Sequence, residues 1–403
     1  MFNKKTYLLV ISSAALLFNS QALADNQSSL KNRIEKLESK IEQLEEKNDF
    51  KVASKIKNLQ LSSYAQLDGN FHNEKTSATS KNDEFKIKLF RIALKGNVSE
   101  DFAFKLENDF ANSDSNIKDA YIKYTGINNN EIVIGQIREP FSIGEAISSK
   151  NTTFIARSEA LDLTPSRSVG IRNDIFSKNN DWLIAFGIFG QPFETTSATD
   201  DTKYSISSRT AYSLKSKEGD VPYFFNIGLS GSYRSLDRDD SNSQTTIDNE
   251  KLLGTELVFA YRNALFASEY IYTDREYGED SNSGVNTDHY AYYVEGSYFI
   301  NGQVRSFDHK NKKLSSVKVN NPVDQGGLGV FEIAARYARL DLNNTENNIV
   351  IDEGDTKEAA LGFNWYLNNY LRFSLNYSKI EINKENSADQ KFDRVSSRLQ
   401  VAF

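Results

Sequence analysis

The stretch Ile134–Gly170 reads IGQIREPFSIGEAISSKNTTFIARSEALDLTPSRSVG and interrupts a chain that otherwise alternates like β-strands. One strand-like segment ends at Arg138, and the next begins at Ser168. The roughly thirty residues between them are too many for a β-hairpin, whose loops usually have about 2–5 residues. Long polar insertions into regular structure usually have a function. We therefore expect segment 139–167 to fold into the lumen of a transmembrane β-barrel and to set its bore and charge preference.

The composition favours strands and excludes several classes of protein. The chain has 403 residues, with 26 Phe and 20 Tyr against 5 Pro and 1 Met, and it has no cysteine. Aromatic residues favour strands, and the lack of cysteine excludes disulfides and thiolate metal sites. A formal net charge of −7 argues against nucleic acid as a partner. Beyond the N-terminus, no apolar run approaches the roughly 18 residues that a membrane helix needs.

Residues 1–24 have the pattern of a secretory signal peptide. Lys4 and Lys5 are followed by the apolar run Leu8–Phe18 and by a small-residue cleavage site that ends at Ala24. A membrane anchor would need a longer apolar run.

Residues 25–57 carry a short heptad pattern. Its apolar positions alternate by four and three residues, as in a coiled-coil seam, and are Leu30, Ile34, Leu37, Ile41 and Leu44. We predict a periplasmic coiled-coil stub that associates in parallel. A solvated helical spacer is the alternative.

From Asn58 to Phe403 the polarity alternates with a period of two, which is the period of a β-strand. In Leu371–Tyr377, for example, Leu, Phe, Leu and Tyr alternate with Arg, Ser and Asn. A soluble β-sandwich could alternate in the same way. The segments are numerous and about ten residues long, with aromatic residues near their ends, and these features favour a membrane barrel.

About sixteen such segments are present, an even number as in bacterial outer-membrane barrels. They begin near residues 58, 84, 101, 117, 131, 168, 180, 203, 222, 252, 264, 287, 329, 355, 369 and 391. Short turns alternate with longer polar connections, which include Ser235–Lys251 and Asn343–Gly354. The connection Asn301–Leu328 breaks this alternation, because it is long and basic where a short turn is expected. We predict an all-β fold: a transmembrane antiparallel β-barrel of about 16 strands over residues 58–403, preceded by a short coiled-coil helix.

The polar faces of these segments, when assigned to the lumen, carry a modest excess of basic residues. The basic candidates are Arg91, Lys95, Lys105, Arg138, Arg172, Arg209, Arg234, Arg336, Arg372, Arg394 and Arg398. The acidic candidates are Asp68, Glu107, Asp119, Glu256, Glu295, Glu332 and Glu358. A low-dielectric wall focuses such a field and enriches anions in a channel. Ion pairs that only stiffen the wall are the alternative.

Several motifs together resemble the phosphate-selective porin O and P family. The motifs are Ser63–Gly69, Lys118–Tyr124, Ile134–Ser142, Ala146–Ser158, Pro165–Ile171, Gly327–Leu342 and Phe363–Tyr377. The resemblance spans most of the mature chain. It implies a homotrimer of sixteen-stranded barrels in the bacterial outer membrane, a third loop folded inward, and a row of lumenal arginines that guide oxyanions. That row is expected at Arg172, Arg209, Arg234, Arg336 and Arg372.

The resemblance also implies an anion site at the constriction. Ser148, Ser149 and Arg157 fall where phosphate-binding members place loop-three ligands. Asp119, Arg138 and Arg91 complete the predicted constriction, although Arg91 stands alone where the family usually has two arginines. Glu145 is a further departure, because phosphate-selective members have a lysine three residues before the first of these serines. A carboxylate at this position would repel phosphate.

The sequence contains no convincing arrangement of catalytic residues. The three histidines, His72, His289 and His309, are too few and too scattered for a metal site. We therefore expect no catalysis, no cofactor and no metal. Three functions remain open: a passive anion channel for phosphate or other small oxyanions, a general or differently selective porin without a phosphate site, and a closed structural or adhesive barrel. The expected partners are small anionic solutes and outer-membrane lipid.

The signal peptide can be tested directly. Because the small-residue site ends at Ala24, N-terminal sequencing of protein purified from outer membranes should begin at Asp25. An intact N-terminus at Met1 in the membrane fraction would show that the segment is retained.

Overall fold

The computed structural model describes residues 56–76, 83–111, 116–193, 202–217, 221–240, 245–277, 286–301, 305–346, 349–384 and 388–403. The unit that we describe is Asn58–Phe403. The predicted signal peptide and nearly all of the predicted coiled-coil stub lie outside the described residues. Among the described residues, no helix is long and apolar enough to cross a membrane.

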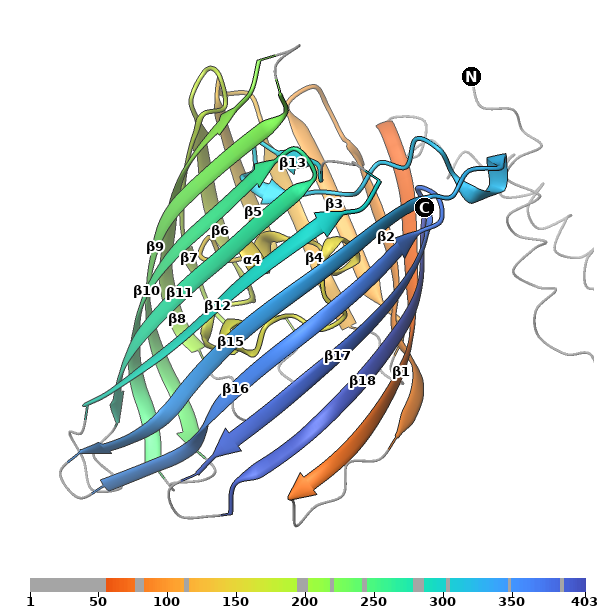
Figure 1. Cartoon of the computed structure of the whole chain (residues 1–403). Coiled ribbons are helices and arrows are strands. Elements are labelled where there is room, and N and C mark those ends of the chain that lie inside the picture. Colours follow the sequence, from red (N-terminus) through yellow and green to blue (C-terminus); the bar gives the residue numbers. More distant parts are fainter. Residues whose placement is uncertain are drawn as a thin grey trace, which may run out of the picture. The chain divides into compact units, whose positions relative to one another are not determined.

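Sixteen antiparallel strands close into one barrel (Figure 1). They are β1 (Lys57–Thr76), β2 (Glu84–Asn97), β3 (Phe102–Asp109), β4 (Asn116–Tyr124), β5 (Asn130–Arg138), β6 (Arg167–Phe176), β7 (Trp182–Phe189), β8 (Thr202–Lys215), β9 (Tyr223–Asp240), β10 (Thr245–Tyr261), β11 (Ala264–Tyr277), β12 (Asn286–Phe299), β15 (Val330–Glu346), β16 (Ile349–Tyr366), β17 (Leu371–Asn383) and β18 (Gln390–Ala402). The last strand returns to the first, with Tyr64 opposite Ala402. Closure leaves no unpaired sheet edge. The predicted sixteen-stranded antiparallel barrel is confirmed.

The remaining elements are short and lie between barrel strands. The connection after β5 contains helix α4 (Ile143–Ala146) and the 3₁₀ turns η1 (Ser149–Asn151) and η2 (Glu159–Leu163). The connection after β12 contains a two-stranded sheet, β13 (Phe307–Asp308) with β14 (Lys313–Leu314), and the turn η4 (Val323–Gln325).

The alternating polarity separates an apolar outer face from an inner face. In β7, Trp182, Ile184, Phe186 and Ile188 point outward and are 45–57% exposed. The side chains between them face inward and are buried. In the last strand, Arg398 and Gln400 are buried inside whereas Val401 is exposed outside. An apolar outer band against a polar interior is the pattern of a barrel surrounded by lipid.

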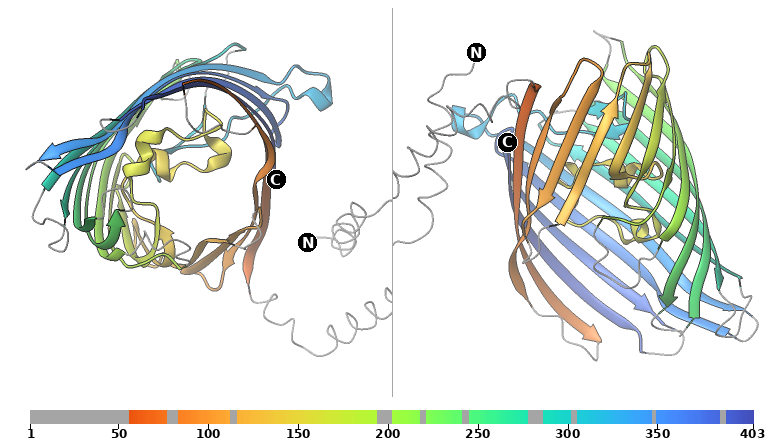
Figure 2. Two further views of the ribbon diagram at one scale, coloured as in Figure 1. Left: turned by 90° about the horizontal axis from the view of Figure 1, so that it is seen from below. Right: turned by 180° about the vertical axis from the view of Figure 1, so that it is seen from behind.

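The strands differ in length around the barrel. β3 and β7 each have 8 residues, whereas β9 and β16 each have 18 residues. Because a tilted strand crosses a bilayer with about 9–11 residues, the long strands extend well beyond the apolar band. The wall from β2 to β7 contains the five strands of 8–10 residues, β3 to β7, and is lower than the wall from β9 to β18, as Figure 1 and Figure 2 show. We call these two parts of the barrel the low wall and the tall wall.

Two of the predicted connections are wrong, because most of their residues belong to strands. Ser235–Lys251 was expected to be a long loop, yet β9 continues to Asp240 and β10 begins at Thr245. Asn343–Gly354 is likewise mostly strand, since β15 ends at Glu346 and β16 begins at Ile349. Beyond the lipid both faces of a strand meet water, so the apolar alternation ends while backbone pairing continues. Register shifts at Ile247/Asn249 and Asp341/Asn343 mark bulges in these extensions.

Gly135 permits a close approach between β4 and β5 just before the inward loop. Its φ is +133°, and a Cβ at this position would lie 2.2 Å from the carbonyl oxygen of Ala120. Only glycine adopts this backbone conformation without strain.

Gly135→Ala should therefore destabilise the barrel by about 1–3 kcal/mol. The measurement is the temperature at which the folded protein loses its compact mobility in a gel. Gly190→Ala is the matched control, because a Cβ there would meet only the Val169 carbonyl oxygen at 4.0 Å. Equal melting of the two variants would contradict the role of Gly135.

Candidate functional site: a constriction beside an inward loop

Residues 139–166, here called loop three, cross the barrel interior between β5 and β6. In the view along the barrel in Figure 2, loop three is the yellow segment within the ring of strands. It packs against the long-strand wall and reaches β1. Irregular backbone inside a barrel is stable only where its polar groups find partners. The contacts of loop three show how this is achieved.

A buried wall carboxylate holds the start of helix α4. Glu269 on β11 accepts hydrogen bonds from the Ser142 hydroxyl at 2.6 Å and from the backbone N–H groups of Ile143 and Gly144 at 3.1 and 2.8 Å. Tyr293 on β12 donates to the same carboxylate at 2.7 Å. Four donors thus converge on one buried carboxyl group, and Glu269 anchors this end of loop three.

Side chains of the long-strand wall satisfy the backbone of the middle of loop three. Arg372 donates to the Thr152 carbonyl at 2.8 Å, and Arg336 donates to the Ala156 carbonyl at 3.0 Å. Other partners follow the same pattern: Gln400 donates to Lys150, Asn364 donates to Thr153, and Asn376 accepts from Ile155. Phe154 packs between these contacts with Ala334 and Ala360. Loop three is thus fixed to the tall side of the barrel.

An open polar space remains between loop three and the low wall. It measures about 270 Å³ and is lined by Arg91, Lys105, Glu107, Asp119, Tyr121, Lys123, Glu131, Val133, Ile137, Arg138, Ala146, Ser148, Arg167, Arg172, Asn311 and Lys313. Seven of these residues are Lys or Arg and three are Asp or Glu. The formal charge of this space is therefore positive, although the chain as a whole is negative. We call this space the constriction.

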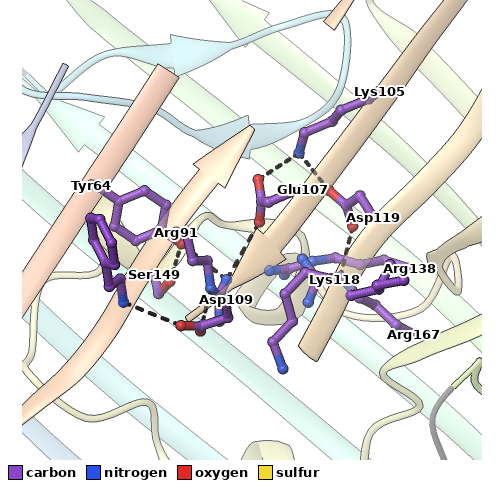
Figure 3. A network of polar contacts seen from close by, with 12 residues as sticks. Tyr64, Arg91, Lys105, Glu107, Asp109, Lys118, Asp119, Arg138, Ser149 and Arg167 are labelled. Atoms are coloured by element: carbon purple, nitrogen blue, oxygen red, sulfur yellow. Dashed lines mark hydrogen bonds and ion pairs between the residues drawn. The ribbon is translucent and has the colours of Figure 1, made fainter. Parts of the chain in front are cut away.

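Cations and carboxylates alternate along the wall of the constriction (Figure 3). Arg91 pairs with Asp109 at 2.8 Å. Lys105 lies 2.8 Å from Glu107 and 2.5 Å from Asp119. Arg167 reaches the second oxygen of Asp119 at 2.7 Å. The network joins β2, β3, β4 and β6 across the low wall.

Three predicted residues lie at this edge of loop three. Ser148 lines the constriction. Ser149 instead reaches the wall, where its hydroxyl lies 3.0 Å from the Tyr64 hydroxyl, which also accepts from Arg91 at 2.9 Å. Glu145 sits between two cations, 3.6 Å from Arg138 and 3.7 Å from Arg157.

Arg157 acts within loop three. Its guanidinium donates to the carbonyl oxygens of Gly144 and Ile147. With Glu145 as a third partner, this side chain joins the two limbs of the loop. The structure therefore gives Arg157 a bracing contact within loop three.

The predicted arginine row is engaged by partners on the wall and in loop three. Arg172 pairs with Asp174, Arg209 with Glu256, Arg234 with Glu250 and Arg336 with Glu358, while Arg372 contacts Thr152 and Gln400. Of the five, only Arg172 lines the constriction. Arg209, Arg234 and Arg336 make the contacts of the ion-pairing alternative, whereas Arg372 is held by hydrogen bonds to loop three and to Gln400.

Three lysines at or near the site were absent from the predicted set. Lys123 of β4 lines the constriction and pairs with Glu131 at 3.1 Å. Lys150 of η1 lies with its amine 5.8 Å from the centre of the Tyr64 ring. Burial lowers the pKa of Lys150, and the nearby cations of Lys105 and Lys95 act in the same direction. Lys313 of β14 lines the constriction from the connection after β12. The basic character of that connection was the one signal in the sequence, but periodicity alone could not place it inside the barrel.

Comparisons with known proteins agree with this architecture. A family model described as phosphate-selective porin O and P matches residues 60–403. Porin O of Pseudomonas aeruginosa is 22% identical over 406 residues, which cover 88% of this chain and 88% of that protein. An uncharacterized protein of Caulobacter vibrioides is 20% identical over 350 residues, which cover 79% of this chain and 68% of that protein.

Solved structures show the same fold at low identity. The outer membrane channel DcaP of Acinetobacter baumannii superposes with a TM-score of 0.55 at 14% identity, over 86% of this chain and 97% of that chain. OmpF of Salmonella typhi, in a complex with daunomycin, superposes with a TM-score of 0.55 at 11% identity over the same shares. Because the family model spans the whole barrel, the chain belongs to the phosphate-selective porin O and P family and is a porin of the bacterial outer membrane.

Proposed function

We propose that this porin is a passive diffusion channel that prefers small anions, phosphate and other small oxyanions among them. The observation that carries the proposal is the charge of the constriction, where seven basic side chains face three acidic ones. The surrounding barrel and lipid have a low dielectric constant, so the field is concentrated in the water-filled space. Anions are enriched there and cations are depleted.

The ion pairs of these basic side chains favour a preference for anions without tight binding of any one anion. Lys105 and Arg167 share the carboxylate of Asp119, and Glu145 lies between Arg138 and Arg157. An oxyanion must therefore compete with fixed carboxylates for most of these cations. We infer that phosphate passes through weak, rapidly exchanging contacts, which suits a diffusion channel.

A general porin without a phosphate site is the second candidate. The engagement of Arg209, Arg234 and Arg336 by wall carboxylates favours it, because paired arginines attract solutes less strongly. The third candidate, a closed adhesive barrel, receives less support because open space adjoins loop three. The family and fold are those of a channel, and we propose neither catalysis, nor a cofactor, nor binding of nucleic acid.

We further propose that the porin is a homotrimer embedded in outer-membrane lipid. The outer face of the low wall exposes large apolar side chains, among them Phe85, Phe102 and Ile134. An apolar face of this kind suits lipid or a second copy of the barrel. A structural neighbour with a TM-score of 0.50, OmpT of Vibrio cholerae, is described in a trimer form.

Planar-bilayer recording tests the proposal. The purified protein should give a reversal potential of the sign expected for chloride preference in a KCl gradient, and added inorganic phosphate should reduce the chloride current. Conductance without ion preference would favour the general porin. Absence of conductance would favour the closed barrel.

Glu145→Gln should increase anion preference, because it removes the carboxylate between Arg138 and Arg157. A unit charge at about 4 Å is worth about 1 kcal/mol in water, so the chloride-to-potassium permeability ratio should rise about two- to fivefold. Asp162→Asn is the matched control, since it removes one exposed carboxylate of loop three that does not line the constriction. A rise no larger than that of the control would show that Glu145 lies outside the ion path.

Arg157→Ala should change the steadiness of the pore more than its selectivity, because Arg157 braces the backbone of loop three. We expect noisier single-channel current with little change of reversal potential. A large loss of anion preference with quiet current would instead place Arg157 in the bore.

A further inference from the structure

Two carboxyl groups lie directly opposite each other on the inner face of the tall wall. Glu256 on β10 and Glu269 on β11 are cross-strand partners, and both side chains are buried. Arg209 on β8 donates to both oxygens of Glu256, at 2.8 and 2.7 Å. Like charges directly opposite each other destabilise a sheet. One guanidinium group therefore serves two buried carboxyl groups, and it is bound to Glu256.

The direct partners of Glu269 are neutral. Its donors are the hydroxyls of Ser142 and Tyr293 and the backbone N–H groups of Ile143 and Gly144. The charged and titratable groups on the elements around it are Arg209 on β8, Glu256 on β10, Tyr293 and Glu295 on β12, and Glu145, Arg157, Glu159 and Asp162 on loop three. Both arginines are engaged, Arg209 by Glu256 and Arg157 by carbonyl oxygens of loop three.

The geometry of these four bonds suits an ionised carboxyl group. Oε1 of Glu269 accepts from Gly144 and Tyr293, and Oε2 accepts from Ser142 and Ile143. A carboxylate only accepts, whereas a protonated carboxyl group also donates. Protonation leaves about three acceptor sites for the four donors. At least one of these bonds is therefore lost when Glu269 takes up a proton.

Helix α4 connects this anchor with the constriction. It starts at the residues that Glu269 binds and ends at Ala146, which lines the constriction together with Ser148. The middle of loop three is held differently, because Arg336 and Arg372 donate to its carbonyl oxygens. Arginine keeps its charge in proteins. Acid therefore weakens the α4 end of loop three and spares the middle.

We propose that Glu269 is a positioning residue through which protons control the opening of the pore. Its ionised carboxyl group holds α4 against the tall wall, and its protonation loosens α4 toward the constriction, so that the channel closes intermittently in acid. Ile143 and Ile147 pack with Val258 in both states, which makes the change reversible. The inference goes beyond the proposed anion preference, because it concerns the opening of the channel and not the choice of ion.

The test is single-channel recording from about pH 8 to about pH 4, a range in which glutamates of folded proteins titrate. Closings of the wild-type channel should become about two- to tenfold more frequent in acid, which is the factor that one hydrogen bond contributes. Glu269→Gln is neutral at every pH and carries a donor of its own. Its closings should have the acid frequency throughout and should not respond to pH.

Glu139→Gln is the matched control. Glu139 is a buried carboxyl group of loop three that also has neutral donors, but these are the hydroxyls of Ser168, Ser205 and Ser207. Hydroxyl groups can rotate and accept a hydrogen bond from an amide. The closings of Glu139→Gln should therefore respond to pH as those of the wild type do.

Tyr293→Phe separates a proton-sensing role from a structural one. It removes one donor from the carboxyl group and leaves the three donors of loop three in place. The ionised form is then less stabilised, so the midpoint of the pH response should move to higher pH by about half a unit to one unit. An anchor that does not sense protons would leave this midpoint unchanged.

A nitroxide label reports the movement of α4 without any current. The chain has no cysteine, so Ala146→Cys and Thr152→Cys can each carry one label. Electron paramagnetic resonance of the labelled protein in lipid vesicles should show that the label at Ala146 becomes more mobile in acid. The label at Thr152 should keep its mobility, because the Thr152 carbonyl is held by Arg372.

The outcomes distinguish the two proposals. Closings that do not depend on pH in the wild type, a Glu269→Gln channel that responds like Glu139→Gln, or equal label mobility at both pH values would overturn the inference. A pore without ion preference would overturn the proposed function alone. If the protein does not conduct, the proposed function fails, and the labels at Ala146 and Thr152 still decide whether Glu269 releases α4.

Discussion

The irregular backbone inside the barrel needs hydrogen-bond partners for its polar groups. This need governs the arrangement of the whole pore. Loop three carries amide and carbonyl groups through the lumen, and each of these groups is costly to bury without a partner. The tall wall supplies the partners, with Glu269 accepting from the start of helix α4 and Arg336 and Arg372 donating to carbonyl oxygens. These side chains are therefore occupied by the loop. Positive charge that faces the bore collects on the opposite, lower wall.

That division gives the constriction two different surfaces. The tall wall and loop three form a packed unit with apolar clusters around Phe141, Phe154 and Leu161. The low wall presents alternating cations and carboxylates, and the β13–β14 hairpin adds Lys313 from below. A solute thus passes beside loop three along a charged wall. The selectivity of such a pore depends on which of its basic side chains lack a fixed carboxylate partner and attract a mobile anion instead.

Local periodicity was sufficient to predict the fold, because every strand of a lipid-facing barrel alternates apolar residues that face outward with residues that face the interior. Fourteen of the sixteen strand starts agree with the structure within one residue or two, as at Glu84, Ala264 and Val330, whereas β10 and β16 begin earlier than expected. Those two extensions lie where both faces meet water, so no apolar alternation marked them. The inward hairpin was also beyond reach, because a short basic segment has no period that would place it inside the barrel.

The candidate site was predictable to a smaller extent. Asp119, Arg91, Arg138 and Ser148 do gather around one space, as the resemblance implied. The partners of Arg157 and Glu145 could not be foreseen, since they depend on how loop three turns back on itself. Lys313 is more than 170 residues from Arg138 along the chain, and only the closed barrel brings the two cations to the same space.

The central claim, that ions pass between loop three and the low wall, is tested most directly by thiol modification of open channels. Ser148 lines the constriction. Thr153 is a small polar residue on the same loop that is 4% exposed, and its hydroxyl accepts a hydrogen bond from the buried Arg305, so Thr153→Cys is the matched buried control. A bulky charged methanethiosulfonate added during recording should reduce the conductance of Ser148→Cys and leave that of Thr153→Cys unchanged. Equal effects on both, or an effect on Thr153→Cys alone, would contradict the account.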